Sequence, residues 1–364
     1  MNFPSTPSRY DSKNNAPNEV CKGTVFVTCS GLMETRFAQI SVSGKSLKVP
    51  GMRIEDRTIV VTGKWIKMAA IHDENWQAGN VEHPESIIAK LKTQPTVADI
   101  FNFAQKLPDI KPRFNYPLEW ENVAAIPITS FEEWWEKRLP QETRKNVRKA
   151  GRRGVVVRTV ELNDVLVQGI KAIYDETPIR QGRRFWHYGK DLETIKRENS
   201  SYLDRCEFIG AFHQEELIGF IKMVYVGKVS NIMQIISKKS HYDKRPANAL
   251  LAKAVEICGK KGMSYFVYGQ YVYGNNNDGA LTEFKRRNGF EQILFPRYYI
   301  PLTAKGRMCM SCRLHLGMRR LIPKGIESFL LRMRSRFYER RYLPRDNAKA
   351  GSTQSEEGLK DQQG

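Results

Sequence analysis

The sequence predicts an α/β fold, a mixed β-sheet flanked by helices, with a smaller α+β domain ahead of it. Three observations lead to this prediction. A chain of 364 residues is long enough for two domains with cores of their own. Its hydrophobic content of 41% and aromatic content of 10% are those of a globular protein. Segments with β-type alternation and segments with helical spacing follow one another through residues 140–302.

Residues 21–135 form the smaller domain in this prediction. Its first part, up to residue 78, shows β-type alternation punctuated by Gly and Pro, which is typical of strands. Residues 83–108 show helical spacing, and Pro95 divides them, so we expect one or two helices there. A short strand at 122–128 and a further helix complete the domain.

Residues 136–303 form the larger domain. Its segments follow the order β-α-α-β-β-β-α-β-α-β, which predicts a mixed sheet with helices on its faces. A basic helix at 141–151 precedes the first strand, and an acidic turn at 214–216 joins two strands as a hairpin. The helix at 247–262 carries an apolar face at helical spacing.

Both ends of the chain are small and polar, so we expect mobile tails at 1–20 and 346–364. Residues 304–345 form a basic helical extension whose apolar residues recur at helical spacing, for example Ile326, Phe329 and Leu330. A basic amphipathic helix of this kind either docks on its own domain or lies on anionic lipid, here through 313–342.

The chain carries 59 Lys and Arg against 39 Asp and Glu, a net charge of +20 that implies an anionic partner. Residues 137–158 hold nine basic residues and one acid. This helix is either a solvated surface or a site that tracks phosphates of tRNA or a nucleotide-linked acceptor through Arg144, Lys145 and Arg148.

Localisation follows from what the sequence lacks. No apolar run approaches the ~20 residues of a membrane span, and we see no secretory signal at the N-terminus. Six cysteines in such a chain are expected to be reduced thiols in the cytoplasm. Cys309, Cys312 and His315 cluster in sequence, but three ligands fall short of a structural zinc site, so we expect no metal.

Three stretches resemble the GNAT acyltransferase fold and, within it, the Fem-like branch of peptidyl- and acyltransferases. Residues 144–157, RKNVRKAGRRGVVV, are similar to the basic helix that opens that branch's second domain. Residues 248–269 are similar to the helix and strand of the donor-binding half, and residues 281–302 to the helix and strand that close the fold. The resemblance implies a GNAT-like sheet over 136–303, with residues 21–135 as a separate α+β unit or a reduced copy of that fold.

The donor site implied by the resemblance lies at the start of the helix at 247–262. In acetyl-CoA enzymes a glycine-rich turn there holds the pyrophosphate with backbone N–H groups. Here the window is YDKRPA, in which Arg245 replaces a glycine and the following proline removes an N–H. This departure favours a larger acyl carrier over CoA. The donor-binding residues implied are Tyr242, Lys244, Arg245 and Asn248.

Lys285 takes the position where GNAT enzymes have a tyrosine acid and Fem-like enzymes a lysine beside the reacting carbonyl. The resemblance therefore implies a catalytic role, in which the ammonium stabilises the oxyanion or the leaving oxygen. The alternative is that Lys285 is one cation of a solvated helix face, within the run KRR.

The segment 172–199 places four aromatic residues, FWHY, behind three arginines. It falls where GNAT-type folds build the acceptor side of their cleft, so rings and guanidinium groups would contact the acceptor. The substrate-binding residues on this basis are Arg180, Gln181, Arg184 and Tyr188, and the candidate bases are Glu176 and His187. In the alternative, the aromatics fasten the segment to the core and Glu176 pairs with an arginine.

Residues 268–279 follow the penultimate strand, where the sheet of this fold parts to admit the acyl arm. Gln270 and Asn275 are the candidates for hydrogen bonds to the acyl carbonyl or an amide. The alternative for the three asparagines before Gly279 is a simple turn.

These observations lead to one hypothesis and one rival. The protein is a cytoplasmic acyltransferase that moves an acyl or aminoacyl group from a carrier to an amine on a small molecule or a cell-envelope precursor. The donor, acyl-CoA, acyl-carrier protein or aminoacyl-tRNA, is a co-substrate, and no cofactor is tightly bound. If residues 313–342 bind lipid, the protein works at the inner face of the membrane. The rival is a non-catalytic RNA- or membrane-surface-binding protein on a transferase-like fold.

Overall fold

The computed structural model describes residues 36–42, 45–93, 98–180, 182–273, 279–316 and Met333. Several predictions concern residues outside these ranges. These residues are the two tails, Gln181, Asn275 and nearly all of the segment 313–342. What the sequence predicts for them therefore stays a prediction.

The first half of the described chain is rich in strands, as predicted. Its elements are β1 (Arg36–Val42), β2 (Lys45–Ile54), β3 (Arg57–Thr62), β4 (Met68–Ile71), η1 (Glu74–Trp76), α1 (Pro84–Lys92), β5 (Ile100–Ala104), β6 (Leu118–Pro127), α2 (Phe131–Glu133) and η2 (Trp134–Arg138). Here η1 is a short 3-10 helix and η2 a turn of π-helix.

The prediction of one or two helices across residues 83–108 is right for α1 and wrong for the second helix. Ile100–Ala104 is the strand β5, which lies in the sheet between β4 and β14 (Glu291–Pro301). All five of its residues are buried. A strand that is buried on both faces has a continuous apolar run, and a run this short fits a helix equally well.

The second half follows the predicted order of strands and helices, with one addition, a pair of two-residue strands within 179–184. Its elements are α3 (Gln141–Arg152), β7 (Val156–Val160), α4 (Asp164–Tyr174), β8 (Ile179–Arg180), β9 (Arg183–Arg184), α5 (Leu192–Asn199), η3 (Leu203–Arg205), β10 (Cys206–His213), β11 (Glu216–Val226), β12 (Val229–Ser237), η4 (Lys239–Lys244), α6 (Pro246–Lys260), β13 (Tyr265–Val267), α7 (Ala280–Arg287), β14, α8 (Ala304–Ser311) and η5 (Leu314–Leu316). The predicted hairpin is confirmed, because β10 and β11 pair antiparallel around a turn in which Gln214 and Glu215 have positive φ.

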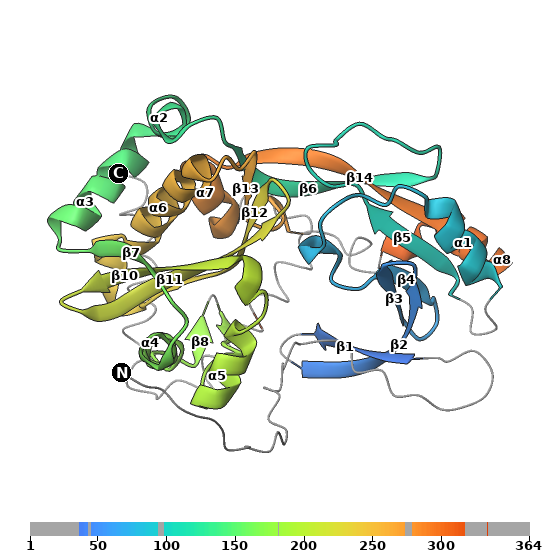
Figure 1. Ribbon diagram of the computed structural model, residues 1–364, viewed down its shortest axis with the longest axis horizontal. Helices are drawn as coiled ribbons and strands as arrows, with labels where there is room; N and C mark the ends of the chain where they lie inside the picture. Colours follow the sequence, from blue (N-terminus) through green and yellow to red (C-terminus); the bar gives the residue numbers. More distant parts are fainter. Residues whose placement is uncertain are drawn as a thin grey trace, which may run out of the picture.

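One sheet of twelve strands runs through the described chain, in the order β1-β2-β3-β4-β5-β14-β6-β13-β12-β11-β10-β7 (Figure 1). Two neighbouring pairs are parallel, β4 with β5 and β12 with β13, and the others are antiparallel. The sheet is therefore mixed, as predicted. It passes from one half to the other through β14, which pairs with both β5 and β6.

Helices cover both faces of the part of the sheet that surrounds β11. Residues of β11 lie in two different apolar clusters: Ile218 and Ile221 lie with α6, and Leu217 and Phe220 lie with α4. The members of each pair are three residues apart because the pairing with β10 shifts register between Leu217 and Gly219. Figure 1 shows α6 above this part of the sheet and α4 and α5 below it. Among the described helices, none has the length and apolar content that a bilayer span requires.

Strands β12 and β13 part soon after they begin to pair. They pair over only three residues each, Val229–Asn231 with Tyr265–Val267. Beyond this point β12 continues along β11 to Ser237, whereas the chain after Val267 stays beside β6, with which β13 is already paired. There the backbone of Ala124 exchanges hydrogen bonds with Tyr268 and Gly269, both at 2.8 Å. The strands separate in the place that the resemblance implied for the acyl arm.

Candidate active site

Lys285 lies on α7 and is fully buried, with 0% of its surface exposed. Its two neighbours in the sequence behave differently. Arg286 and Arg287 are exposed, and both pair with Glu283 at 2.6 Å on the outer face of the same helix. The solvated helix face considered as an alternative for Lys285 therefore describes these two arginines and not the lysine.

A collar of residues from the chain after β13 surrounds the Lys285 ammonium. Its Nζ donates a hydrogen bond to the Gln270 carbonyl oxygen at 2.5 Å. The rings of Tyr268 and Tyr273 lie 4.6 and 4.7 Å from Nζ, close enough for cation–π attraction. Among the described residues, no carboxylate forms an ion pair with Lys285. We call Tyr268, Gln270 and Tyr273 the Lys285 collar.

Burial lowers the pKa of Lys285 to about 8, because removal from water disfavours the charged form and nearby carboxylates do not compensate. An amine with a pKa near the working pH can both give and take a proton. Perturbed groups of this kind gather at functional sites more often than elsewhere.

The parting of β12 and β13 explains how the collar reaches Lys285. After Val267 the chain follows β6, and Asn122 of β6 accepts a hydrogen bond from the Val272 N–H at 2.7 Å. Gly269 adopts a positive φ of 56°, and a Cβ there would lie 2.8 Å from the Tyr273 hydroxyl. Glycine is therefore needed at this position for the collar to close. The pattern of YFVYGQYVY, residues 265–273, predicts a strand that reaches Tyr273, and this prediction is wrong, since β13 ends at Val267.

Asn248 connects the collar to the start of α6. Its side-chain amide donates to the Asn288 side-chain oxygen at 3.0 Å. Asn288 is buried and follows Lys285 by three residues, and its N–H is bonded to the Lys285 carbonyl at 3.1 Å. The structure thus brings together two predicted groups of residues, the donor site at α6 and the catalytic lysine.

The N-terminus of α6 has no side-chain cap. Arg245 precedes it in the left-handed conformation with φ of 57°, and Pro246 occupies the first helical position. The Arg245 Nε is buried and has no hydrogen-bond partner among the described residues. Lys244 is partly buried beside it, while Tyr242 is exposed. Unpaired N–H groups and a guanidinium make this end of the helix a suitable place for an anionic group.

Glu176 is held by several donors. It accepts hydrogen bonds from the backbone N–H of Lys239 at 2.7 Å and of Ser240 at 2.9 Å, and it pairs with Arg180 at 3.1 Å. Burial raises the pKa of Glu176, but these hydrogen bonds and the arginine outweigh it, so the net pKa lies below its usual value. A carboxylate stabilised in this way is a weak base. It anchors the start of η4, which leads into α6.

Arg180 uses its guanidinium inside the protein. Besides Glu176 it donates to the carbonyl oxygens of Ser237 and Ile173, at 2.8 and 3.0 Å. Its Nε is buried without a hydrogen-bond partner in the described chain. Arg180 therefore ties the segment after α4 to the end of β12.

His187 is buried between aromatic rings, with Tyr174 at 4.2 Å and Trp186 at 3.7 Å between ring centroids. Burial first, and then the charges of Lys190 and Arg180, lower the pKa of His187 to about 3. The imidazole is neutral at physiological pH, and one ring nitrogen lies 3.1 Å from the Gln234 side-chain nitrogen. So low a pKa makes His187 a poor general base.

The four aromatic residues of this segment divide between core and surface. Phe185 and His187 are buried, whereas Trp186 and Tyr188 are exposed. Arg184 in β9 is exposed as well. The alternative from the sequence therefore applies to Phe185 and His187, whose rings fasten the segment to the core. Trp186, Tyr188 and Arg184 lie on the surface, and their contact with an acceptor stays a prediction.

The basic helix α3 packs on α6, and its three singled-out cations differ in surroundings. Arg144 donates to the carbonyl oxygens of Trp135 and Glu136 and pairs with the Glu136 carboxylate at 2.8 Å. Lys145 is exposed, and Arg148 is exposed with its guanidinium 5.7 Å from the Trp135 ring centroid. Arg144 thus supports the local structure, and Lys145 and Arg148 remain accessible.

In the part of the chain that the structure describes, no group of three side chains suited to metal binding lies together. Cys309 is buried and Cys312 is exposed, so the two thiols of the CMSC stretch point into different surroundings.

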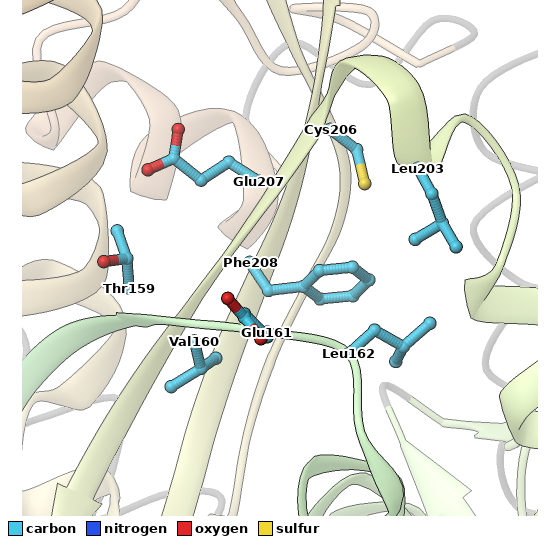
Figure 2. A pocket seen from close by; sticks show the side chains of 8 residues that line it. All are labelled: Thr159, Val160, Glu161, Leu162, Leu203, Cys206, Glu207 and Phe208. Atoms are coloured by element: carbon cyan, nitrogen blue, oxygen red, sulfur yellow. The ribbon is translucent and has the colours of Figure 1, made fainter. Parts of the chain in front are cut away.

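A cavity of about 430 Å³ opens elsewhere, where β7 and β10 separate beyond Val160 and Phe208. In Figure 2 the Phe208 ring, Leu162, Leu203 and the Cys206 thiol surround one space, with Glu207 directed away from it. Burial raises the pKa of the Cys206 thiol, which disfavours the reactive thiolate. None of the predicted site residues lines this cavity, so it is not part of the candidate site.

Sequence reasoning missed three members of the site, Tyr268, Tyr273 and Asn288. The tyrosines looked like strand residues, and Asn288 looked like a helix end before a glycine. Their spacing from Lys285 carries no pattern, because they meet it only after the strands part.

Comparisons with known proteins concern the fold. No family model matches the chain, and no curated protein matches its sequence. Among solved structures the chain is similar to L-PGS from Bacillus licheniformis, with 15% identity and a TM-score of 0.50, over 75% of this chain and 89% of that one.

Two other similar structures are FemX and a GCN5-related N-acetyltransferase from Kribbella flavida. FemX has 11% identity and a TM-score of 0.48, over 73% of this chain and 88% of that one. The N-acetyltransferase has 10% identity and a TM-score of 0.33, over 70% and 89%. The likeness to L-PGS confirms the predicted fold, a GNAT-like mixed sheet flanked by helices, and at this identity it shows the fold alone.

Proposed function

We propose that this protein transfers an acyl or aminoacyl group from a carrier to an amine, with Lys285 as the catalytic residue. The observation that supports the proposal most is the buried ammonium of Lys285, which has one carbonyl and two rings around it and a pKa lowered to about 8. A buried cation without a carboxylate partner is unfavourable for folding, and such groups are typical of sites where charge develops during a reaction.

In the proposed reaction a neutral amine attacks the carbonyl carbon of the donor. The Lys285 ammonium stabilises the oxyanion of the tetrahedral intermediate, an effect on the order of 3 kcal/mol for one donor in a dry site. The carbonyl re-forms as the bond to the carrier breaks. Lys285 gives a proton to the leaving atom and regains one from the new amide nitrogen, so the proton count balances. A pKa near neutrality suits both transfers.

Glu176 and His187, the bases expected from the sequence, are assigned positioning roles in this proposal. Both have lowered pKa values, and both are held by neighbours inside the fold. Glu176 holds η4 at the entrance to α6. His187 holds the segment that exposes Trp186 and Tyr188, which we propose contact the acceptor together with Arg184.

The N-terminus of α6 is the proposed site for an anionic part of the donor, with Arg245, Lys244 and Asn248 around it. Three classes of donor carry such an anionic part: acyl-CoA, acyl-carrier protein and aminoacyl-tRNA. Because Arg245 and Pro246 replace the open backbone that a pyrophosphate would need, we favour the two larger carriers. Lys145 and Arg148 are further exposed cations on α3, the helix that packs on α6.

The test is a transfer assay with the purified full-length chain, in which each of the three donors is supplied with a mixture of amines. Lys285→Met should reduce turnover at least 100-fold with the fold intact. Arg286→Met is the matched control, since it changes the adjacent but exposed cation of the same helix. Equal turnover in wild type and Lys285→Met would rule out the proposal.

The rival function is binding without catalysis, to RNA or to a membrane surface. The net charge of +20 favours it equally well. A purely binding protein would show no donor consumption with any carrier and no response to Lys285→Met. Saturable donor consumption that Lys285→Met abolishes would exclude it.

A further inference from the structure

The connection between β3 and β4, residues 63–67, lies against α8 on the surface of the first half. Together they expose a group of large apolar and basic side chains. We call it the Trp65 face, and it consists of Lys64, Trp65, Lys67, Lys305 and Met308.

Trp65 stands at the tip of a tight turn. Gly63 opens the turn with φ of 97°, where a Cβ would lie 2.0 Å from the Ile66 carbonyl oxygen. Only glycine fits there, so the turn is held tight and the next side chains project outward. Trp65 is 60% exposed, whereas Ile66 packs into the apolar cluster around Cys309. The indole is therefore displayed on an anchored turn.

Helix α8 is anchored next to this turn. Its N-cap Thr303 accepts the Gly306 N–H at 3.0 Å and donates to Asp99 at 3.0 Å. Gly306 packs so closely that a Cβ would lie 2.0 Å from the Asp99 carbonyl oxygen. Lys305 bonds to the carbonyl oxygen of Trp65, with its Nζ 5.7 Å from the indole centroid. The turn and the helix are thus in direct contact and form one continuous surface.

The charge on this face is positive. Lys64 and Lys67 are exposed, and Lys305 is about two-fifths exposed. Among the described residues, Asp99 is the carboxylate in contact with this face. It is buried and already bonded to Lys305 and Thr303. Met308, 56% exposed, lies one helical turn from Lys305 and so shares its side of α8.

From this combination we infer that the Trp65 face binds the surface of an anionic lipid bilayer. Tryptophan favours the interface between headgroups and acyl chains, where its ring is half dry and its N–H stays hydrated. Lysine and arginine are attracted to anionic headgroups. A nucleic acid would satisfy the cations but would leave Met308 in water, whereas a bilayer satisfies the cations and the apolar side chains together. The inference does not depend on the proposed transfer activity.

The first experiment measures binding of the full-length chain to vesicles of phosphatidylglycerol mixed with phosphatidylcholine, and to phosphatidylcholine alone. Lys64→Gln with Lys67→Gln should weaken binding to the anionic vesicles roughly 25-fold, since each headgroup attraction contributes about fivefold. The matched control is Arg152→Gln with Arg197→Gln, which removes the same charge from exposed sites on α3 and α5. It should lower binding less than threefold. Equal losses in the two variants would mean attraction to net charge alone and would overturn the inference.

The second experiment follows contact between Trp65 and lipid. Vesicles with brominated acyl chains should quench part of the tryptophan fluorescence, and Trp65→Phe should remove most of that quenching. Trp186→Phe, at a site that is 50% exposed, is the control and should keep it. If the fluorescence of Trp65→Phe is quenched as strongly as that of wild type, the Trp65 face does not enter the bilayer. If Trp65 is shielded from soluble quenchers before vesicles are added, another segment of the chain covers the face, and the inference is wrong.

Discussion

Two lysines are buried in the part of the chain that the structure describes, and they differ in what surrounds them. Lys222 on β11 donates to three oxygens, the carbonyls of Asn199 and Ser201 at 2.7 Å and the Ser201 hydroxyl at 3.1 Å. Lys285 has one carbonyl oxygen and two tyrosine rings. The same side chain is thus buried once among oxygens and once in an aromatic collar.

The difference separates a structural cation from a candidate catalytic one. An ammonium has three N–H donors, and at Lys222 all three find oxygens, two of them at the C-terminal end of α5 where carbonyls need donors. At Lys285 the rings attract charge but accept hydrogen bonds poorly, so the ammonium keeps the capacity to bond to a reacting oxygen. Burial of a lysine therefore does not by itself indicate a candidate active site. The number of hydrogen-bond acceptors around the ammonium distinguishes the two lysines.

The largest expected effect is on stability at Lys222. Lys222→Met should lower the free energy of unfolding by roughly 2–4 kcal/mol, because the buried Asn199 carbonyl and the partly buried Ser201 carbonyl lose their donor. Urea denaturation at pH 7 measures it. A change below 0.5 kcal/mol would mean that Lys222 does not hold α5 to the sheet.

Lys285→Met should change the free energy of unfolding in the opposite direction. The pKa of Lys285 is lowered from 10.5 to about 8, so the charged form is disfavoured in the folded protein by at most about 3 kcal/mol. Removing the charge should raise the free energy of unfolding by up to this amount. The same urea denaturation applies, with Arg286→Met as the control that should stay within about 0.5 kcal/mol of wild type. Destabilisation by Lys285→Met would put Lys285 in the same class as Lys222.

The pH dependence of the difference between wild type and Lys285→Met sharpens this test. Below pH 8 Lys285 is charged in both states and its burial opposes folding in full. Between about pH 8 and 10.5 the unfolded chain binds a proton that the folded chain does not, so the wild type gains stability relative to the variant. Lys106, whose pKa burial also lowers to about 8, is present in both proteins and cancels. In the transfer assay turnover should fall as pH rises through about 8, and a pH-independent turnover would contradict the role of the ammonium.

A smaller effect is expected for the collar. Tyr273→Leu removes one ring face from the ammonium, about 1 kcal/mol of attraction, and should reduce turnover roughly fivefold. Tyr273→Phe keeps the ring and should match wild type. If the two variants behave alike, the hydroxyl or the backbone matters more than the ring.

The smallest effect is expected at Glu176. Glu176→Gln keeps the shape of the side chain and loses the charge that pairs with Arg180, so stability should fall by about 1 kcal/mol. Turnover should change less than threefold, and the pH profile should keep its midpoint. A 100-fold loss of turnover would instead make Glu176 the general base.

The order of strands and helices was predictable because it depends on local patterns. The alternation of β10 and β11, the turn at Gln214 and Glu215 and the apolar face of α6 follow from residues that are close in sequence. The strand β5 was not predictable in this way. Its five buried residues fit a helix and a strand equally well, and only its neighbours β4 and β14, distant in sequence, decide between them.

The candidate site shows the same division. The sequence by itself determined that Lys285 lies on a helix before the last strand and that a basic, aromatic segment follows α4. Whether that lysine faces water or the interior was decided only by tertiary structure, through the parting of β12 and β13 and the collar that Tyr268 and Tyr273 form. The physical reason is that local patterns determine which residues form a helix, whereas the surroundings of a charge depend on segments that meet only when the sheet is assembled.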